Sequence, residues 1–131
     1  VLPTVEYSVV NIRTEEEYKN LISGKDLPVN ITHVVINFGA PWCTSCKRIK
    51  NEYENLVSQY PNIVFAKFNI DEMEDLAVNL GITMLPTFMF HHVKNQSIKF
   101  DKLLTSNMKE VIKKIDSVLL ADLQISDEED F

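Results

Sequence analysis

VVINFGAPWCTSCK, residues 34–47, joins an apolar run to a closely spaced pair of cysteines. The run from Val34 to Phe38 is interrupted only by Asn37, which is typical of a central strand covered on both faces. From Thr44, or from the cysteine before it, apolar residues recur every three or four positions, which predicts a helix ending before Pro61. The local order is therefore a strand, a loop that carries the cysteines, and a helix.

Cys43 and Cys46 are the only two cysteines of the chain. Two thiols separated by two residues at a helix start lie close enough to form a disulfide that opens and closes reversibly. Metal binding is the alternative, but two thiols do not fill a four-ligand zinc site. His91 and His92 do not complete one, because adjacent strand residues point to opposite faces; we expect both at the surface or at a strand end. Redox chemistry without a metal or cofactor is favoured over a metal site or an inert pair.

The composition fits one globular domain without a nucleic-acid or membrane partner. The chain has 131 residues, 45% of them hydrophobic, and a net charge of −6 that argues against nucleic-acid binding. No apolar run approaches the roughly 20 residues of a membrane span. No amino-terminal secretory pattern is present, although a start at Val1 rather than Met leaves a removed targeting segment open. We expect a cytoplasmic monomer, with an organelle or secretory compartment as the alternative.

The rest of the chain alternates strand and helix patterns. Strands are predicted at residues 5–10, 63–70, 84–90 and 97–101, and helices at 14–22, 71–80 and after Ser106. The strand–helix–strand order around the cysteines favours parallel pairing through a right-handed crossover, and the last two strands favour an antiparallel hairpin. One domain is expected over residues 5–122, between a loose start at 1–4 and a solvated, mobile acidic tail at 123–131.

Two helix starts carry the pattern of a capping box. Thr14 is followed by Glu17, and Asp71 by Glu74, so each pair predicts a helix that begins at that position. Gly81 predicts a left-handed residue after the second of these helices.

Three segments appear in a specific order: Ala40–Lys47 after the apolar strand, Phe68–Asp71 about two dozen residues later, and Gly81–Thr87 after that. In this order they resemble thioredoxin. The resemblance spans roughly Val5 to Asp122 and implies an α/β thioredoxin fold, a central mixed sheet of about five strands flanked by about four helices. It also implies that Pro86 is cis and lies against the disulfide.

The cysteines take different expected roles. Cys43 would precede a helix, where free backbone N–H groups and the positive end of the dipole lower the pKa of a thiol from about 8.5. Cys43 is therefore the expected nucleophile. Cys46, one turn further in, would be more buried and would resolve the mixed disulfide with a substrate.

Neighbouring side chains suggest a surface for a partner. Trp42 offers an apolar plate beside the nucleophile, and Met84, Leu85 and Pro86 offer a groove with exposed backbone groups for an extended peptide. The resemblance implies reduction of protein disulfides, with electrons resupplied by a reductase.

The sequence departs from the family at two positions that bear on proton transfer. Asn37 stands where the family has a buried Asp, and an amide cannot take a proton at neutral pH. Lys67 matches the Lys that pairs with that Asp, so its charge is uncompensated unless it reaches water or a thiolate. We hypothesise that Asn37 slows substrate release by Cys46 and that Lys67 favours the thiolate form; without the resemblance, a solvent-facing Lys67 is the simpler interpretation.

Three further differences affect rigidity and docking. Thr44 and Ser45 replace the family's Gly-Pro between the cysteines, Asn51 replaces a helix-kinking Pro, and Asp101 falls near a Gly beside the groove. Two alternative functions therefore stay open: an oxidase or isomerase of an oxidising compartment, and a binding module in which the cysteines contribute little. The absence of a His between the cysteines tells mildly against the oxidase.

Overall fold

The computed structural model describes residues 8–93 and 100–129. Over these residues the chain forms five strands and four helices. In order they are β1 (Val10–Ile12), α1 (Glu15–Ser23), β2 (His33–Gly39), α2 (Thr44–Gln59), β3 (Ile63–Asn69), α3 (Glu74–Asn79), β4 (Thr87–His92), β5 (Asp101–Leu104) and α4 (Met108–Glu129).

The strands form one mixed sheet in the order β1-β3-β2-β4-β5. β2 and β3 pair in parallel over their full length, and β1 pairs in parallel with β3. β4 runs antiparallel to β2, and β5 antiparallel to β4. The parallel pairing around the cysteines, the final antiparallel hairpin and the five-stranded mixed sheet are all confirmed.

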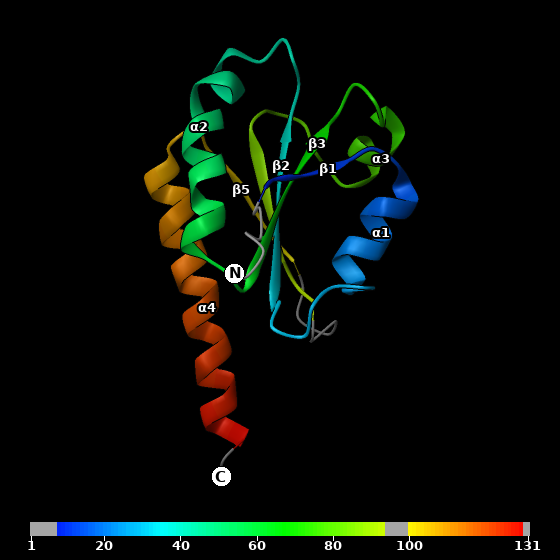
Figure 1. The fold of residues 1–131 in the computed structure, drawn as a ribbon. Coiled ribbons are helices and arrows are strands. Elements are labelled where there is room, and N and C mark those ends of the chain that lie inside the picture. The colour runs from blue at the N-terminus through cyan, green and yellow to red at the C-terminus, as the bar shows by residue number, and fades with distance from the viewer. Residues whose placement is uncertain (1–7, 94–99, 130–131) are drawn as a thin grey trace, which may run out of the picture.

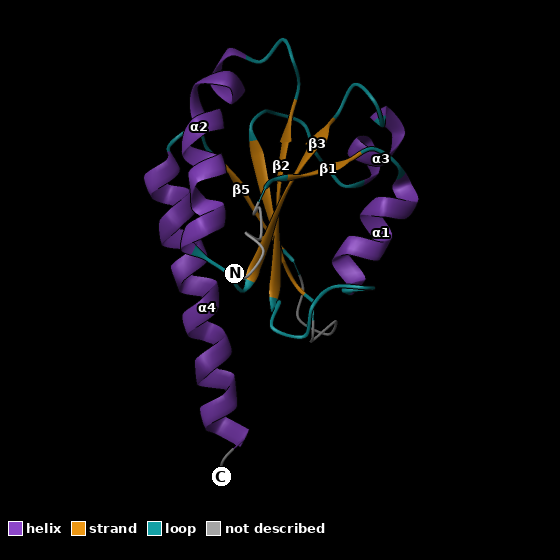
Figure 2. Cartoon of the chain, viewed as in Figure 1, coloured by secondary structure: helices purple, strands orange, loops and turns teal. Residues whose placement is uncertain are grey.

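Helices cover both faces of the sheet, with α2 and α4 along one face and α1 and α3 along the other (Figure 1). Colouring by secondary structure shows the strands as the middle layer (Figure 2). Side chains of β2 contribute to the hydrophobic cores on both faces of the sheet, because successive residues of a strand point to opposite faces. Val34, Ile36 and Phe38 pack on the side of α1 and α3, and Val35 packs on the side of α2 and α4. Asn37 shares its face with Val35 and therefore lies toward α2.

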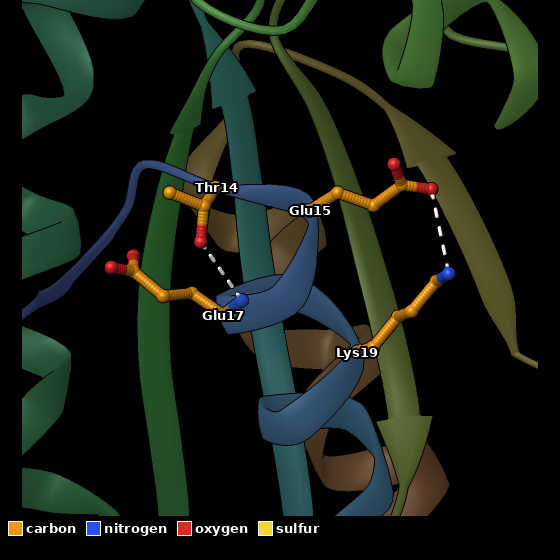
Figure 3. A network of polar contacts seen from close by, with 4 residues as sticks. All are labelled: Thr14, Glu15, Glu17 and Lys19. Carbon is orange, nitrogen blue, oxygen red and sulfur yellow. Dashed lines mark hydrogen bonds and ion pairs between the residues drawn. The ribbon is translucent and has the colours of Figure 1, made fainter.

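α1 begins as its sequence predicts. The Thr14 hydroxyl accepts a hydrogen bond from the Glu17 backbone N–H at 3.1 Å, and the Glu17 carboxylate accepts one from the Arg13 backbone N–H at 2.8 Å. One turn along the helix, Glu15 and Lys19 form an exposed ion pair at 3.6 Å (Figure 3). The hydrogen bonds to the Thr14 hydroxyl and to the Glu17 carboxylate satisfy two backbone N–H groups near the helix start.

α2 is held against the sheet through Tyr53. The buried hydroxyl of Tyr53 donates toward the carbonyls of Ala66 and Val35, at 2.7 and 3.1 Å, and so contacts both β3 and β2. Burial raises the pKa of Tyr53 well above its ordinary value. This attachment positions the first turn of α2, which carries the cysteines, relative to the ends of β2 and β3.

The third helix does not start where the sequence predicts. α3 begins at Glu74, and Met73 precedes it without a side-chain capping bond. The Asp71 carboxylate instead accepts hydrogen bonds from the indole of Trp42. Gly81 does follow α3 with a left-handed φ of 77°, as expected.

Both outer strands lie further along the chain than predicted. β1 spans Val10–Ile12 rather than residues 5–10, and β5 spans Asp101–Leu104 rather than residues 97–101. Residues 5–7 and 97–99 of the predicted segments lie outside the described residues. β-propensity alone does not set register, which here follows the pairing of β1 with β3 and of β5 with β4.

α4 continues to Glu129, past the boundary we expected at 122. Its sequence contains no Gly or Pro that would end it earlier. Residues 130–131 of the acidic tail lie outside the described part of the chain. None of the described helices is both long and apolar enough to span a bilayer.

Candidate active site

The two cysteines lie at the end of the sheet where the carboxyl ends of β2 and β3 are found. A short loop leads from Gly39 to Cys43, and β4 starts at this same edge because it runs antiparallel to β2. Phe38 is paired with Thr87, so Pro86, which precedes β4, lies across from the end of β2. The Leu85–Pro86 peptide bond is cis, as the resemblance implied.

Cys43 and Cys46 form a disulfide, with their Cα atoms 5.3 Å apart. Cys43 is the N-cap residue of α2, and its Sγ accepts a hydrogen bond from the Cys46 backbone N–H at 3.2 Å. Free N–H groups and the positive end of a helix dipole stabilise negative charge. The Cys43 sulfur is therefore placed to carry charge as a thiolate once the disulfide opens.

The relative burial of the two cysteines is opposite to our expectation. Cys43 is 7% exposed, whereas Cys46 is partly exposed. Gly39 lies beside Cys46, because a Cβ placed at Gly39 would lie only 3.1 Å from the Cys46 Sγ. Both residues line a cavity.

This cavity has a volume of about 380 Å³ and is lined by residues of β1, β2, β3 and α2. Cys46, Asn37 and Lys67 all line it, so the structure brings three of the predicted catalytic positions together. Its charged lining consists of four cationic side chains, Lys67 among them, and two carboxylates: Arg13, Lys47, Lys50, Lys67, Glu54 and Glu72.

Asn37 and Lys67 are neighbours across β2 and β3. The Oδ1 atom of Asn37 is buried and has no hydrogen-bond partner within the described residues. Lys67 is exposed, so its charge reaches water, which is the simpler of the two interpretations of this residue. Both side chains border the cavity that reaches Cys46.

Trp42 is 65% exposed beside Cys43. Its indole N–H points to the Asp71 carboxylate, with nitrogen–oxygen distances of 3.1 and 3.3 Å. Sequence reasoning missed this role of Asp71, because local spacing favoured a helix cap and the two residues are 29 positions apart. This hydrogen bond fixes the position of the indole ring next to Cys43.

Apolar residues of differing exposure lie at the same end of the sheet as the disulfide. Met84 is 62% exposed, Leu85 is partly buried and Pro86 is buried. Leu104, which sequence reasoning did not single out, is 50% exposed and pairs with Thr87 at the same sheet edge.

The expectation that Asp101 lies beside the groove is wrong. Asp101 pairs with Phe90, three residues along β4 from Thr87, and forms an ion pair with Lys114 at 3.2 Å. Three strand residues correspond to roughly 10 Å. Its charge therefore lies at the other end of the hairpin and does not narrow the groove.

The adjacent histidines occupy different environments at the end of β4, one of the two places we expected for them. His91 is buried there rather than at the surface: it is 9% exposed, and its ring lies 6.2 Å from that of Tyr18 and 5.3 Å from that of Phe100. Burial lowers the pKa of His91 to about 4. The ring of His92 instead meets that of His33 at 4.6 Å. Within the part of the chain the structure describes, no group of three potential ligands could hold a metal ion.

A cysteine pair that closes as a disulfide at a helix start, on a mixed sheet between helices, defines a thiol–disulfide exchange site. Known proteins agree. The thioredoxin family model matches residues 9–117. A thioredoxin-like protein of Fusarium culmorum is 37% identical over 111 residues, which cover 82% of this chain and 81% of the relative. An H-type thioredoxin of Populus jackii is 34% identical over 108 residues, 82% of this chain and 74% of the relative.

Solved structures show the same relationship. A thioredoxin h from poplar superposes with a TM-score of 0.73 at 33% identity, covering 86% of this chain and 96% of the poplar chain. A Plasmodium falciparum thioredoxin gives a TM-score of 0.72 at 28% identity, covering 83% and 98%. The chain belongs to the thioredoxin family, has the thioredoxin fold and is a thiol-disulfide oxidoreductase. Members of this family generally act on protein disulfides together with a reductase.

Proposed function

We propose that this protein reduces disulfide bonds in other proteins, with Cys43 as the nucleophile and Cys46 as the resolving thiol. The observation that carries this assignment is the hydrogen bond from the Cys46 backbone N–H to the Cys43 Sγ at the N-terminus of α2. It stabilises the thiolate of Cys43 in preference to that of Cys46. The thiolate is the attacking species in disulfide exchange.

The reaction balances over two exchange steps. The Cys43 thiolate attacks one sulfur of the substrate disulfide, a mixed disulfide forms, and the other substrate sulfur leaves as a thiolate. Cys46 then loses its proton and attacks the Cys43 sulfur, which releases the second substrate sulfur. The substrate gains two electrons, and the protein is left with the Cys43–Cys46 disulfide seen in the structure.

The surface around the disulfide suits an extended segment of a protein substrate. Trp42, Met84 and Leu104 expose apolar area there, next to the strand ends of the sheet. Apolar pockets for side chains and free backbone groups are the usual means of binding an extended peptide. We propose that the protein works as a cytoplasmic monomer and that a separate reductase enzyme returns it to the dithiol state.

Trapping tests both the activity and the roles of the cysteines. The wild-type protein is expected to reduce insulin, and Cys43→Ser is expected to abolish the reaction. Cys46→Ser is expected to accumulate a mixed disulfide between Cys43 and the substrate, visible by mass spectrometry, because no thiol remains to resolve it. A mixed disulfide that accumulates in Cys43→Ser instead would reverse the assigned roles.

A more oxidising role is the second candidate, because four cationic side chains line the cavity at Cys46 and stabilise thiolates. Stabilising the reduced form raises the reduction potential. The potential can be titrated against a thiol buffer, with Trp42 as the only tryptophan to report on the transition. A reduction potential of about −270 mV supports a reductase, and a potential of about −120 mV favours an oxidase. A pair without a reversible transition would point to a binding module.

A further inference from the structure

Lys102, on the edge strand β5, reaches the carboxyl end of α3. It is paired with Met89 of β4, and directly opposed residues of an antiparallel pair share a face of the sheet. Met89 packs with residues of α1 and α3, so the Lys102 side chain lies on that same face. Its Nζ atom donates a hydrogen bond to the Leu80 carbonyl at 2.9 Å, although the two residues are 22 positions apart. The contact therefore connects the edge of the sheet to the end of α3.

The Lys102 amine also lies close to the backbone of Gly81. A Cβ placed on Gly81 would lie 2.7 Å from the Lys102 Nζ, closer than a real Cβ comes to another heavy atom. Gly81 also has a left-handed φ of 77°, which glycine adopts without strain. A side chain at this position would push the amine away, so the glycine leaves room for the contact from β5.

The Leu80 carbonyl belongs to a helix end, where the last carbonyls have no partner within the helix. One of these is satisfied by the chain that follows, since the Ala77 carbonyl accepts the backbone N–H of Ile82 at 3.0 Å. The Leu80 carbonyl is satisfied from a distant strand, by the amine of Lys102. Lysine side chains commonly bond to the last carbonyls of a helix in this way.

The segment Gly81–Pro86 joins this end of α3 to β4 and carries part of the surface assigned to protein substrates. At its far end the Thr87 hydroxyl donates a hydrogen bond to the Met84 carbonyl at 2.7 Å. At its near end stands the bond from β5 to the Leu80 carbonyl. The segment is thus held near both ends by side chains of other elements, while the Met84 side chain between them is 62% exposed.

The exposure of Lys102 limits the size of the effect. Its side chain is exposed, so water competes for the amine and for the carbonyl. Exposed contacts of a charged side chain contribute little, which corresponds to a shift of about two- to fivefold in a local equilibrium. Such a shift is large enough to change the binding of an extended substrate, because a segment already held in its bound conformation loses less conformational freedom on binding.

We propose that Lys102 is a positioning residue for protein substrates: through the Leu80 carbonyl it holds the segment Gly81–Pro86 in the conformation that presents Met84 to the substrate. Its amine bonds to the end of α3, so its influence on the cysteine pair is indirect. The inference rests on the proposed reduction of protein disulfides and adds to that site a residue on the edge strand of the sheet. The chemistry at Cys43 is unchanged, and the binding of an extended chain is strengthened.

Lys102→Met tests the proposal, because methionine keeps an apolar stem and removes the donor. The reduced protein is mixed with increasing concentrations of insulin, and oxidation of the cysteine pair is followed by Trp42 fluorescence. We expect the KM for insulin to rise by about two- to fivefold with an unchanged maximum rate. The rate with bis(2-hydroxyethyl) disulfide, which is too small to need the segment, should also stay unchanged. An unchanged KM, or an equal loss of rate with both disulfides, would overturn the proposal.

Lys113→Met is the matched control. It removes the same charge from an exposed position on α4 and is expected to behave like the wild type with both disulfides. A rise in KM of the same size in this variant would show that net charge, and not the bond to Leu80, causes the effect.

Hydrogen exchange follows the segment without any substrate. The backbone N–H groups of Gly81 and Ile82 bond to the carbonyls of Val78 and Ala77 at the end of α3, both at 3.0 Å. We expect these two amides to exchange about two- to fivefold faster in Lys102→Met, because local opening becomes easier, and at the wild-type rate in Lys113→Met. Unchanged exchange in Lys102→Met would refute the positioning role.

The two measurements separate this inference from the proposed function. If the wild-type protein reduces insulin and Lys102→Met has an unchanged KM, this inference alone is refuted, even where exchange is faster. If the wild-type protein does not reduce insulin, the proposed function is refuted, and the exchange rates still decide whether Lys102 holds the segment.

Discussion

Asn37 shows how one side chain alters the chemistry of a site without altering its shape. It lies on the α2 side of β2, borders the cavity at Cys46 and has Lys67 as its neighbour on β3. Its buried Oδ1 accepts no hydrogen bond within the described residues. An amide there cannot remove the proton of Cys46.

Asn37→Asp should therefore speed the step in which Cys46 resolves the mixed disulfide. The carboxylate would add a proton acceptor beside the cavity, next to the Lys67 ammonium. We expect insulin turnover to rise by about tenfold, below the roughly 100-fold that a fully positioned general base contributes. Stopped-flow decay of the mixed disulfide measures the step directly.

Asn11→Asp is the matched control, because it adds the same charge to the same cavity from β1. It should leave the resolving step unchanged. If Asn37→Asp alters neither turnover nor the thiol titration, the hypothesis about this position is wrong.

His91 should make the protein less stable in mild acid. Its folded-state pKa of about 4 lies below the ordinary value of 6.5, so the unfolded chain binds more protons between these values. The stabilisation is complete above about pH 6.5 and is lost as the pH falls toward 4. From pH 7.5 to pH 5 we expect the free energy of unfolding to fall by about 2 kcal/mol through this group.

Urea unfolding of the wild type and of His91→Phe at both pH values measures this effect. Phenylalanine keeps a ring between Tyr18 and Phe100 but does not titrate. The fall should be smaller in the variant by about the same 2 kcal/mol. Parallel profiles would show that another group controls the acid sensitivity.

Helix starts differ in how well local sequence predicts them. At α1 the capping side chain and its N–H partner are three residues apart, and the predicted contact forms. At α3 the same spacing is present, but Asp71 bonds to Trp42 across the fold and the helix starts later. A helix cap and a hydrogen bond to an indole each contribute only on the order of 1 kcal/mol. Because the two energies are similar, a tertiary contact can form in place of the local cap.

Thr14→Ala should destabilise the protein by about 1 kcal/mol, because it leaves the Glu17 N–H without its capping oxygen. Lys19→Ala breaks the ion pair with Glu15 on the same helix, which is 60–70% exposed, and should change stability by less than about 0.5 kcal/mol. Urea denaturation of both variants tests the comparison (Figure 3). A larger effect for Lys19→Ala would show that surface charge, and not the cap, stabilises α1.

On the scale of the whole molecule, the site lies where elements distant in sequence meet. β2 contributes Asn37, the start of α2 contributes the disulfide, and the segment before β4 contributes Met84 and Pro86. Exposed apolar residues lie at the same end of the sheet as the disulfide, and a cavity lined by more cationic than acidic side chains borders Cys46.

Met84→Glu should therefore impair reduction of protein disulfides more than reduction of small ones. We expect kcat/KM with insulin to fall by about three- to tenfold, since one exposed apolar contact contributes about 1 kcal/mol. The rate with a small neutral disulfide should stay unchanged. Leu120→Glu, at a 57% exposed position on α4, is the matched control and should affect neither rate. Equal loss with both substrates would mean that Met84 supports the site itself.

Much of this protein could be predicted from its sequence, because the signals are local. The apolar run of β2, the helical spacing of α2 and α4, the Thr14 cap and the left-handed Gly81 depend on residues within a few positions of one another. The cysteine pair needs only its own spacing and the helix after it. The order of motifs was enough to identify the family.

Tertiary structure decided the features that depend on distant partners. The bond between Asp71 and Trp42, the place of Asp101 on the hairpin and the burial of His91 follow from pairing and packing between separate elements. So does the exposure of Cys46 rather than Cys43, since Cys46 lines a cavity that forms only when β1, β2, β3 and α2 assemble. Local propensity carries no information about which surfaces such an assembly leaves open, since that depends on contacts far apart in the chain.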